Sequence, residues 1–343
     1  MNSADHTTHD LVAQIEGAAS VAELAAAAAR IDDLVARWYH DGTPIDAIAD
    51  AVSRLNTHLF SRLWSLLAPA ELVDNSCLIV MGSEGRREQI LKTDQDNALL
   101  LRDGVEPAGA GEVAGRFSQA LSELGYPPCP GDIMLSNPLW RQPLAAFRNT
   151  LRDWLYGADP DGPLRLAIFL DAAPVAGDAE LLREARAYLD RIFADNDALL
   201  ARFAAPADQF DEDRSWWTRF TTRSDDRALD IKKLGTFPIV HGVRALALQH
   251  RVSAVGTAQR LDALVERGLL DAALAHELIT ALHTLMAFKL DHQLRQRAHG
   301  RPADNLLRPS ALESAQREEL KNALTTARRF RAFLRRHFKL DAL

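Results

Sequence analysis

The chain has 343 residues, 47% of them apolar and 25% charged, which predicts two or three domains and excludes a disordered chain or a fibrous repeat. Its 40 basic and 47 acidic residues give a net charge of −7, which makes nucleic acid an unlikely partner, because a nucleic-acid binder needs a basic face. The two cysteines, Cys77 and Cys129, are too few for a disulfide framework and are expected to be reduced thiols of a cytoplasmic protein. The sequence predicts no signal peptide and no membrane span.

The first part of the chain is predicted to be helical. Apolar residues recur every three or four positions over residues 11–68, as they do on the buried face of a helix. Thr43 and Pro44 are typical of a helix start, and Pro69 of a helix end. We therefore expect an N-terminal helical region over residues 1–71.

The character of the sequence changes over residues 72–178. Short apolar runs at 77–81 and 97–102 predict buried strands, and residues 110–124 predict a helix. A third apolar run, Leu166–Leu170, is expected to form a later strand that ends at Asp171. Strands mixed with helices indicate an α/β or α+β domain.

The remainder, residues 179–343, is predicted to be helical. The expected helices are 179–201, 239–250, 257–266, 271–298 and 310–338, and prolines separate several of them. The last helix is basic and could face nucleic acid, or it could be a solvated face of a packed helix. The predicted fold class is α+β, mostly α overall, with a small mixed sheet flanked by N- and C-terminal helical bundles.

One segment, residues 81–96, carries most of the chemical signal. Gly82-Ser83 follows the first predicted strand, where a glycine lets the backbone approach a phosphate closely, and Arg86 adds a cationic fork. Asp94 and Asp96 are two positions apart, so on an extended segment both side chains point to one face. Two such carboxylates repel each other unless a cation lies between them, and Mg²⁺ commonly binds carboxylates together with substrate phosphates.

Each of these short patterns alone is most often a turn or a solvated loop. In this order and spacing they resemble the nucleotidyltransferase superfamily that includes DNA polymerase beta. The segment from Gly82 to Asp96 is similar to the uridylyltransferase domain of the bacterial PII-modifying enzyme. It is also similar to nucleotidyltransferases that are often fused to CBS and cyclic-nucleotide-binding modules, whose Gly-aromatic-Pro-Pro-Cys-Pro-Gly pattern matches Gly125 to Gly131.

The resemblance implies a role for each matching residue. Asp94, Asp96 and Asp171 would hold Mg²⁺ or Mn²⁺, with Asp171 as the third, catalytic carboxylate from a later strand. Two further aspartates, Asp132 and Asp178, are weaker candidates, and Asp178 is more typical of a helix cap. This chain has Ala173 where relatives usually have an arginine, which puts either substrate binding or activity in doubt.

Phosphate binding would fall to a second set of residues by the same resemblance. The expected ligands of the nucleoside triphosphate are Gly82, Ser83, Arg86, Arg87 and Lys232. For Lys232, a position on a charged helix face is an equally good interpretation. Trp216 and Trp217 could stack on a base or could pack in the interior.

The resemblance thus implies a Mg²⁺-dependent nucleotidyltransferase that transfers an NMP from an NTP to a hydroxyl of a protein or small molecule. The expected partners are the NTP and a protein acceptor or regulator, and no membrane. The alternative is a non-catalytic module of the same fold that senses a nucleotide. A third hypothesis is a helical interaction scaffold without affinity for nucleotides. The expected domains are residues 1–71, 72–178 and 179–343.

Overall fold

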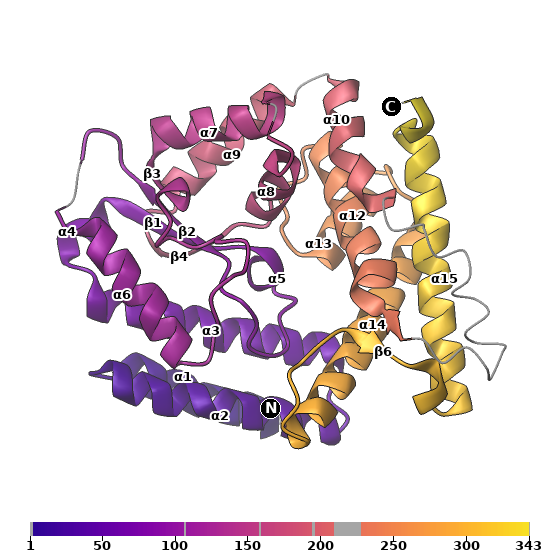
Figure 1. Ribbon diagram of the computed structural model, residues 1–343, viewed down its shortest axis with the longest axis horizontal. Coiled ribbons are helices and arrows are strands. Elements are labelled where there is room, and N and C mark those ends of the chain that lie inside the picture. The colour runs from indigo at the N-terminus through magenta and orange to yellow at the C-terminus, as the bar shows by residue number, and fades with distance from the viewer. Residues whose placement is uncertain (1–2, 106–107, 158, 194–195, 209–227, 343) are drawn as a thin grey trace. The chain divides into compact units, whose positions relative to one another are not determined.

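The computed structural model describes residues 3–105, 108–157, 159–193, 196–208 and 228–342 (Figure 1). The described chain is mostly helical and contains a small mixed sheet, which confirms the predicted α+β fold class. It divides into two compact units, residues 1–192 and 193–343, so the sheet and the N-terminal helices belong to the same unit. The predicted three-part division at residues 71 and 178 stays a prediction.

The N-terminal helices of the first unit pack on one another. They are α1 (Ser3–Gly17), α2 (Val21–His40), α3 (Ile45–Leu67) and the short α4 (Ala70–Asp74). The periodicity seen in the sequence explains the packing, because the apolar stripe of α3 is buried against α1, α2 and α6. The boundaries agree with the helical region predicted over residues 11–68.

The sheet has four strands in the order β3-β2-β1-β4. Its strands are β1 (Ser76–Val80), β2 (Asn97–Leu101), β3 (Arg141–Pro143) and β4 (Ala173–Gly177). β1 pairs antiparallel with both β2 and β4, while β2 and β3 are parallel. Every residue of β1 and β2 is buried, as their continuous apolar runs predict. In Figure 1, α7 and α9 lie on one side of this sheet and α3 on the other.

Five further helices complete the first unit. They are α5 (Gly82–Gly85), α6 (Ala110–Glu123), α7 (Leu144–Tyr156), α8 (Gly162–Phe169) and α9 (Glu180–Ile192). A 3-10 turn, Pro138–Trp140, precedes β3. α6 corresponds to the helix predicted over 110–124, and α5 is a single turn directly after β1.

The prediction of a strand at Leu166–Leu170 is wrong. These residues lie in and just after α8, which has Pro163 in its first turn, and the strand comes later, as β4. A short apolar run fits a buried helix as well as a buried strand, and only its surroundings distinguish the two. Asp171 therefore lies in the connection between α8 and β4 rather than at the end of a strand.

Among its described residues, the second unit has helices and one short two-stranded ladder. Its helices are α10 (Asp197–Ala204), α12 (Phe237–Gln249), α13 (Thr257–Glu266), α14 (Ala272–Ala298) and α15 (Ser314–His337). A π-helix, Lys232–Thr236 (η3), precedes α12, and 3-10 turns occupy Ala205–Asp208, Pro309–Ala311 and Leu340–Ala342. β5 (Leu229–Asp230) pairs antiparallel with β6 (Leu306–Leu307). Trp216 and Trp217 lie outside the described residues.

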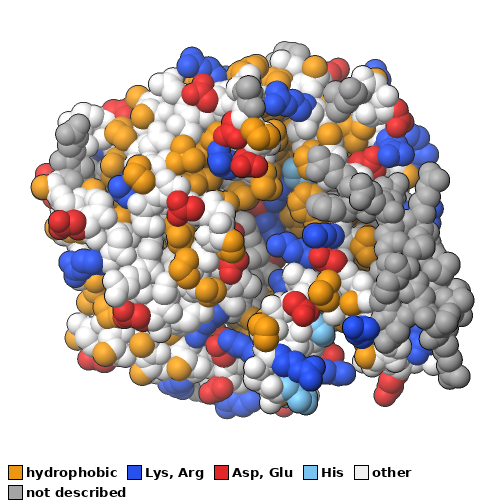
Figure 2. Space-filling model, viewed as in Figure 1, with side chains coloured by type: hydrophobic (Ala, Val, Ile, Leu, Met, Phe, Trp, Pro, Cys, Tyr) orange, Lys and Arg blue, Asp and Glu red, His pale blue; other side chains and the backbone are white. Residues whose placement is uncertain are grey.

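The surface carries both signs of charge. Figure 2 shows basic and acidic side chains interspersed on the visible face, with apolar side chains between them. Among the described residues, no helix combines the length and the apolar character that crossing a membrane requires. Both cysteines are free thiols, as predicted.

Candidate functional site

The end of β1 brings together two of the predicted acidic residues. Val80, the last residue of β1, pairs with Asn97 at the start of β2 on one side and with Ala173 at the start of β4 on the other. Asp96 directly precedes Asn97, and Asp171 precedes Ala173 by two positions. The antiparallel register therefore delivers both acidic residues to the same end of the sheet, on opposite sides of β1.

Gly82 lies against Asp96. A Cβ built on Gly82 would stand 2.5 Å from Asp96 Oδ2, and the φ angle of Gly82 is +58°, in the region that disfavours other residues. The backbone N–H of Met81, one residue earlier, donates a 2.8 Å hydrogen bond to the Asp96 carbonyl. A glycine is thus required at position 82 to let the first turn of α5 meet this carboxylate.

Gly85 makes a similarly close contact, with the backbone of Asp171. A Cβ at Gly85 would overlap the backbone carbonyl oxygen of Asp171 and would come within 2.9 Å of the Val80 carbonyl oxygen. Both contacts involve backbone atoms, so no side-chain rotation can relieve them. The two glycines of α5 are therefore needed for different reasons. Gly82 leaves room for the side chain of Asp96, and Gly85 leaves room for the backbone of Asp171.

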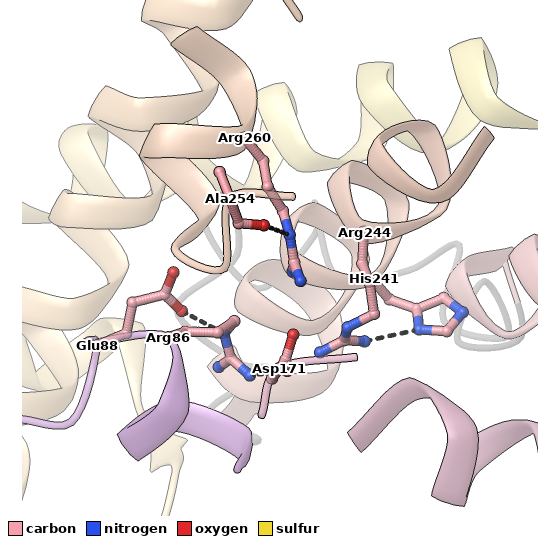
Figure 3. Close-up of polar contacts among 7 residues, drawn as sticks. All are labelled: Arg86, Glu88, Asp171, His241, Arg244, Ala254 and Arg260. Carbon is pink, nitrogen blue, oxygen red and sulfur yellow. Dashed lines mark hydrogen bonds and ion pairs between the residues drawn. The ribbon is translucent and has the colours of Figure 1, made fainter. Parts of the chain in front are cut away.

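Arg86 holds two carboxylates at once. Its Nη1 donates to Asp171 Oδ2 at 2.5 Å, and its Nε donates to Glu88 Oε2 at 2.6 Å (Figure 3). The Asp171 side chain is fully buried, and Arg86 is only 12% exposed. Burial acts to lower the pKa of Arg86, but the charges of Glu88 and Asp171 outweigh it, so the pKa is raised and the guanidinium stays charged.

A second guanidinium approaches Asp171 from α9. Arg186 donates a hydrogen bond to the Ala172 carbonyl, and burial lowers its pKa although the charge of Asp171 opposes that shift. By the resemblance, an arginine is usual at the position of Ala173, and this chain lacks it. Arg86 and Arg186 nevertheless supply positive charge next to Asp171. In the structure, Asp171 is neutralised by arginine.

Asp94 and Asp96 lie in the connection between α5 and β2, near the end of β1. Asp94 is exposed and Asp96 half-buried, while Gln95 between them is buried. The segment has no regular secondary structure and ends where β2 begins, and the common facing of the two carboxylates stays a prediction. Both aspartates line a small cavity of about 20 Å³, whose other lining residues include Gln95, Glu84, Gln89, Asn97 and Tyr126.

The same cavity contains a carboxyl group that the motif interpretation did not single out. Glu84 is buried, and Asn56 of α3 donates to its Oε2 at 2.9 Å. Tyr126 donates in turn to the Asn56 side-chain oxygen at 2.6 Å. Burial raises the pKa of Glu84 to about 8, against the opposing effect of the Asn56 hydrogen bond. An acidic residue inside an otherwise buried stretch is the only sequence signal that points to this group.

Cys129 was interpreted as an ordinary reduced thiol, but it lies next to Asp96. Burial raises the pKa of this thiol, and the neighbouring Asp96 carboxylate raises it further. Cys129 belongs to the turn that follows α6, and that turn is tied to the acidic segment by the hydrogen bond from the Gln95 N–H to the Pro127 carbonyl, at 2.9 Å. The turn therefore forms one border of the site.

The remaining predicted residues are more loosely placed. Ser83 is half-buried in α5, and Arg87 is exposed, with an ion pair to Asp50 at 3.6 Å. Asp178 caps α9 through the Glu180 N–H, as its position after a glycine suggested. Lys232 is an exposed residue of the second unit, where the Asp230 side chain accepts a hydrogen bond from its backbone N–H. Its predicted contact with phosphate is untested.

The chemistry of a divalent cation fits part of this arrangement. Within the described ranges, no three His, Cys, Asp or Glu side chains are grouped closely enough to hold a metal ion. Asp94 and Asp96, however, line one cavity, and Mg²⁺ needs only one or two carboxylates when phosphates and water supply the rest. Asp171 is held by Arg86 and does not belong to this pair.

The comparison with protein families decides what kind of protein carries this site. Residues 29–161 match the family model described as "Putative nucleotidyltransferase DUF294", and residues 197–338 match "Putative nucleotidyltransferase substrate binding domain". Two regions of the chain are thus similar to the two domains that these models describe. The first match includes the segment from Gly82 to Asp96 but ends before Asp171, and Lys232 falls in the second. No curated protein matches the chain.

The second match contains buried basic residues that the motif interpretation did not treat as a site. On α12, His241 Nε2 donates to the Phe203 carbonyl at 2.7 Å, and its Nδ1 accepts a hydrogen bond from Arg244 Nη1 at 3.0 Å. On α13, Arg260 Nε donates to the Ala254 carbonyl at 2.9 Å. Figure 3 shows both arginine contacts, and all three side chains are almost fully buried.

Proposed function

We propose that the chain is a divalent-metal-dependent nucleotidyltransferase that transfers an NMP from an NTP to a hydroxyl group of a protein or small molecule. The observation that carries the proposal is the Asp94 and Asp96 pair, which lines one cavity, with Asp96 against the glycine at the first turn of α5. The matches to nucleotidyltransferase domains support the general reaction. A uridylyltransferase-like role in signal transduction is the finer form of this proposal.

Asp94 and Asp96 would hold Mg²⁺ or Mn²⁺ through their carboxylate oxygens. When bound, such an ion neutralises charge on the phosphates and polarises the phosphorus that is attacked. The backbone of Gly82 and Ser83 would approach the phosphates, because a helix start presents N–H groups without carbonyl partners in the helix. Arg87 is exposed close to this turn and could add positive charge toward the triphosphate.

The transfer itself is an in-line displacement. The acceptor hydroxyl oxygen forms a bond to the α-phosphorus, the bond from that phosphorus to the α,β-bridging oxygen breaks, and pyrophosphate leaves with the electron pair. The hydroxyl proton passes to a carboxylate, for which Asp171 is the residue implied by the resemblance. Asp171 is buried and bound to Arg86, so it could accept a proton only after that ion pair opens.

The test is transfer of label from α-³²P NTPs, with Mg²⁺ or Mn²⁺ and a panel of protein and small-molecule acceptors. Asp94→Asn and Asp96→Asn should each lower metal-dependent transfer at least 100-fold, since an amide removes a charged ligand. Asp153→Asn is the matched control, because Asp153 is an exposed residue of α7 that has no assigned role in the site. Equal transfer by wild type and both site variants would refute the proposal.

A nucleotide sensor without turnover is the second candidate. The ion pair between Arg86 and Asp171 favours it, because the carboxylate that the resemblance makes catalytic is neutralised inside the protein. Calorimetry separates the two candidates. A sensor would bind an NTP with Mg²⁺ and release no pyrophosphate with any acceptor, whereas a transferase would release it in step with label transfer.

A further inference from the structure

The side chain between the two aspartates points into the protein. Gln95 is 4% exposed, whereas Asp94 is exposed and Asp96 is half-buried. Peptide bonds join Gln95 to both aspartates, so fixing the backbone and side chain of Gln95 restricts the positions that the two carboxylates can take. Whatever holds Gln95 in place also orients the acidic pair.

Gln95 is held by four hydrogen bonds to one region of the first unit. Its Nε2 donates to the carbonyl oxygens of Ser118 and Tyr126, both at 2.9 Å, and to Ser122 Oγ at 3.1 Å. Its backbone N–H donates to the Pro127 carbonyl at 2.9 Å. Ser118 and Ser122 belong to α6, and Tyr126 and Pro127 to the turn that follows it. Gln95 therefore connects the acidic segment to the end of a helix.

Glutamine is suited to this position for a chemical reason. The Ser118 and Tyr126 carbonyl oxygens and the Ser122 hydroxyl all accept from the Gln95 amide, and neither leucine nor an ionised glutamate could donate to them. Asparagine has the donor but is one methylene shorter, so its amide would fall short of α6. Several buried hydrogen bonds together can hold a loop against the mutual repulsion of two carboxylates.

We propose that Gln95 is a positioning residue that orients Asp94 and Asp96 toward a divalent cation and its nucleotide. The inference rests on the proposed function, because it gives the acidic pair a ligand. It assigns Gln95 no contact with substrate. Removal of its amide is expected to let the segment rotate, so that the two carboxylates no longer present their oxygens to the same ion.

The test measures Mn²⁺ binding to the full chain, from the electron paramagnetic resonance signal of free Mn²⁺, with each of four α,β-methylene NTP analogues. Gln95→Leu should weaken Mn²⁺ binding about tenfold, the usual effect of removing a group that orients a metal ligand. Gln119→Leu, on the exposed face of α6, should bind as wild type does. Phe117→Leu, in the core of the same helix, controls for lost stability without touching Gln95.

A milder variant keeps the test decisive if Gln95→Leu does not fold. Ser122→Ala removes one acceptor of the Gln95 amide and should weaken Mn²⁺ binding about two- to threefold. Unchanged Mn²⁺ binding in Gln95→Leu, or an equal loss in Phe117→Leu at matched stability, overturns the inference while leaving the proposed function intact if Asp94→Asn abolishes binding. Absence of any Mn²⁺ and nucleotide binding by the wild type counts instead against the proposed function.

Discussion

Arg86 joins Asp171 to the protein through a 2.5 Å ion pair between Nη1 and Oδ2, and the carboxylate it binds is fully buried. Removing one partner of a buried pair leaves a charge without compensation, which is more costly than removing both. Arg86→Met should therefore lower the free energy of unfolding by about 3 kcal/mol, and adding Asp171→Asn should restore most of that loss. Urea unfolding of the four proteins measures the coupling. Additive losses would mean that Arg186 alone neutralises Asp171.

Gly85 of α5 and Gly115 of α6 are predicted to respond in opposite ways to replacement by alanine. Gly85→Ala should lower the free energy of unfolding by more than about 3 kcal/mol, because the new methyl overlaps the Asp171 backbone. Gly115→Ala on α6 meets nothing within 4 Å and should stabilise the protein by about 0.5–1 kcal/mol through helix propensity. Thermal unfolding compares the two. A tolerated Gly85→Ala would contradict the close approach of α5 to the loop before β4.

Glu84 predicts a dependence of stability on pH. The pKa of Glu84 is about 8 in the folded protein, above its ordinary value of 4.5, so the folded state binds this proton more tightly. The contribution of Glu84 is then complete below about pH 4.5 and is lost as the pH rises toward 8. Glu84→Gln keeps an acceptor for Asn56 and cannot ionise.

The difference in melting temperature between Glu84→Gln and wild type should consequently grow from pH 5.5 to pH 8.5, with the variant the more stable at the higher pH. Glu123→Gln, on the exposed face of α6, is the matched control and should show no such change. A constant difference across this range would mean that Glu84 is ionised in the folded protein at all of these pH values.

The contacts of Lys92 predict that helix α2 stabilises the segment that leads to Asp94 and Asp96. Its ammonium donates to the Ala28 carbonyl at 2.8 Å, lies 3.4 Å from Asp32 and stands 5.7 Å from the centre of the Tyr126 ring. Lys92→Met should lower the free energy of unfolding by about 2 kcal/mol, because two polar groups of α2 lose a buried partner. Lys233→Met, an exposed lysine, should change it by less than about 0.5 kcal/mol. Equal effects of the two substitutions would contradict a supporting role.

Local sequence patterns predicted the central part of the sheet and most helices. Continuous apolar runs predicted β1 and β2, because both strands are buried on both faces. The predicted boundaries of α13, 257–266, are those observed. β4 could not be predicted in this way. It is an edge strand whose second residue is Pro174, and an edge can accommodate a residue that has no N–H to donate.

The candidate site, too, could be predicted only in part from the sequence. The nearness of Asp94 and Asp96 to each other follows from their spacing in the sequence, and both line one cavity. The side-chain partners of Gln95 are 23 to 31 positions away along the chain, and the partner of Glu84 is 28 positions away. The packing of the helices decides which of these residues come within hydrogen-bond distance. The arginine on Asp171 is 85 positions from its carboxylate, a distance over which no local pattern carries information.

The single turn of α5 has a consequence for how this segment can change in length. Gly82 meets Asp96 and Gly85 meets Asp171, and three residues of helix separate these contacts by about 4.5 Å along the axis. One inserted residue would rotate the second glycine by about 100° and bring a side chain against the Asp171 backbone. The turn is thus constrained in its length as well as in its two glycines, and insertions or deletions within it are not tolerated.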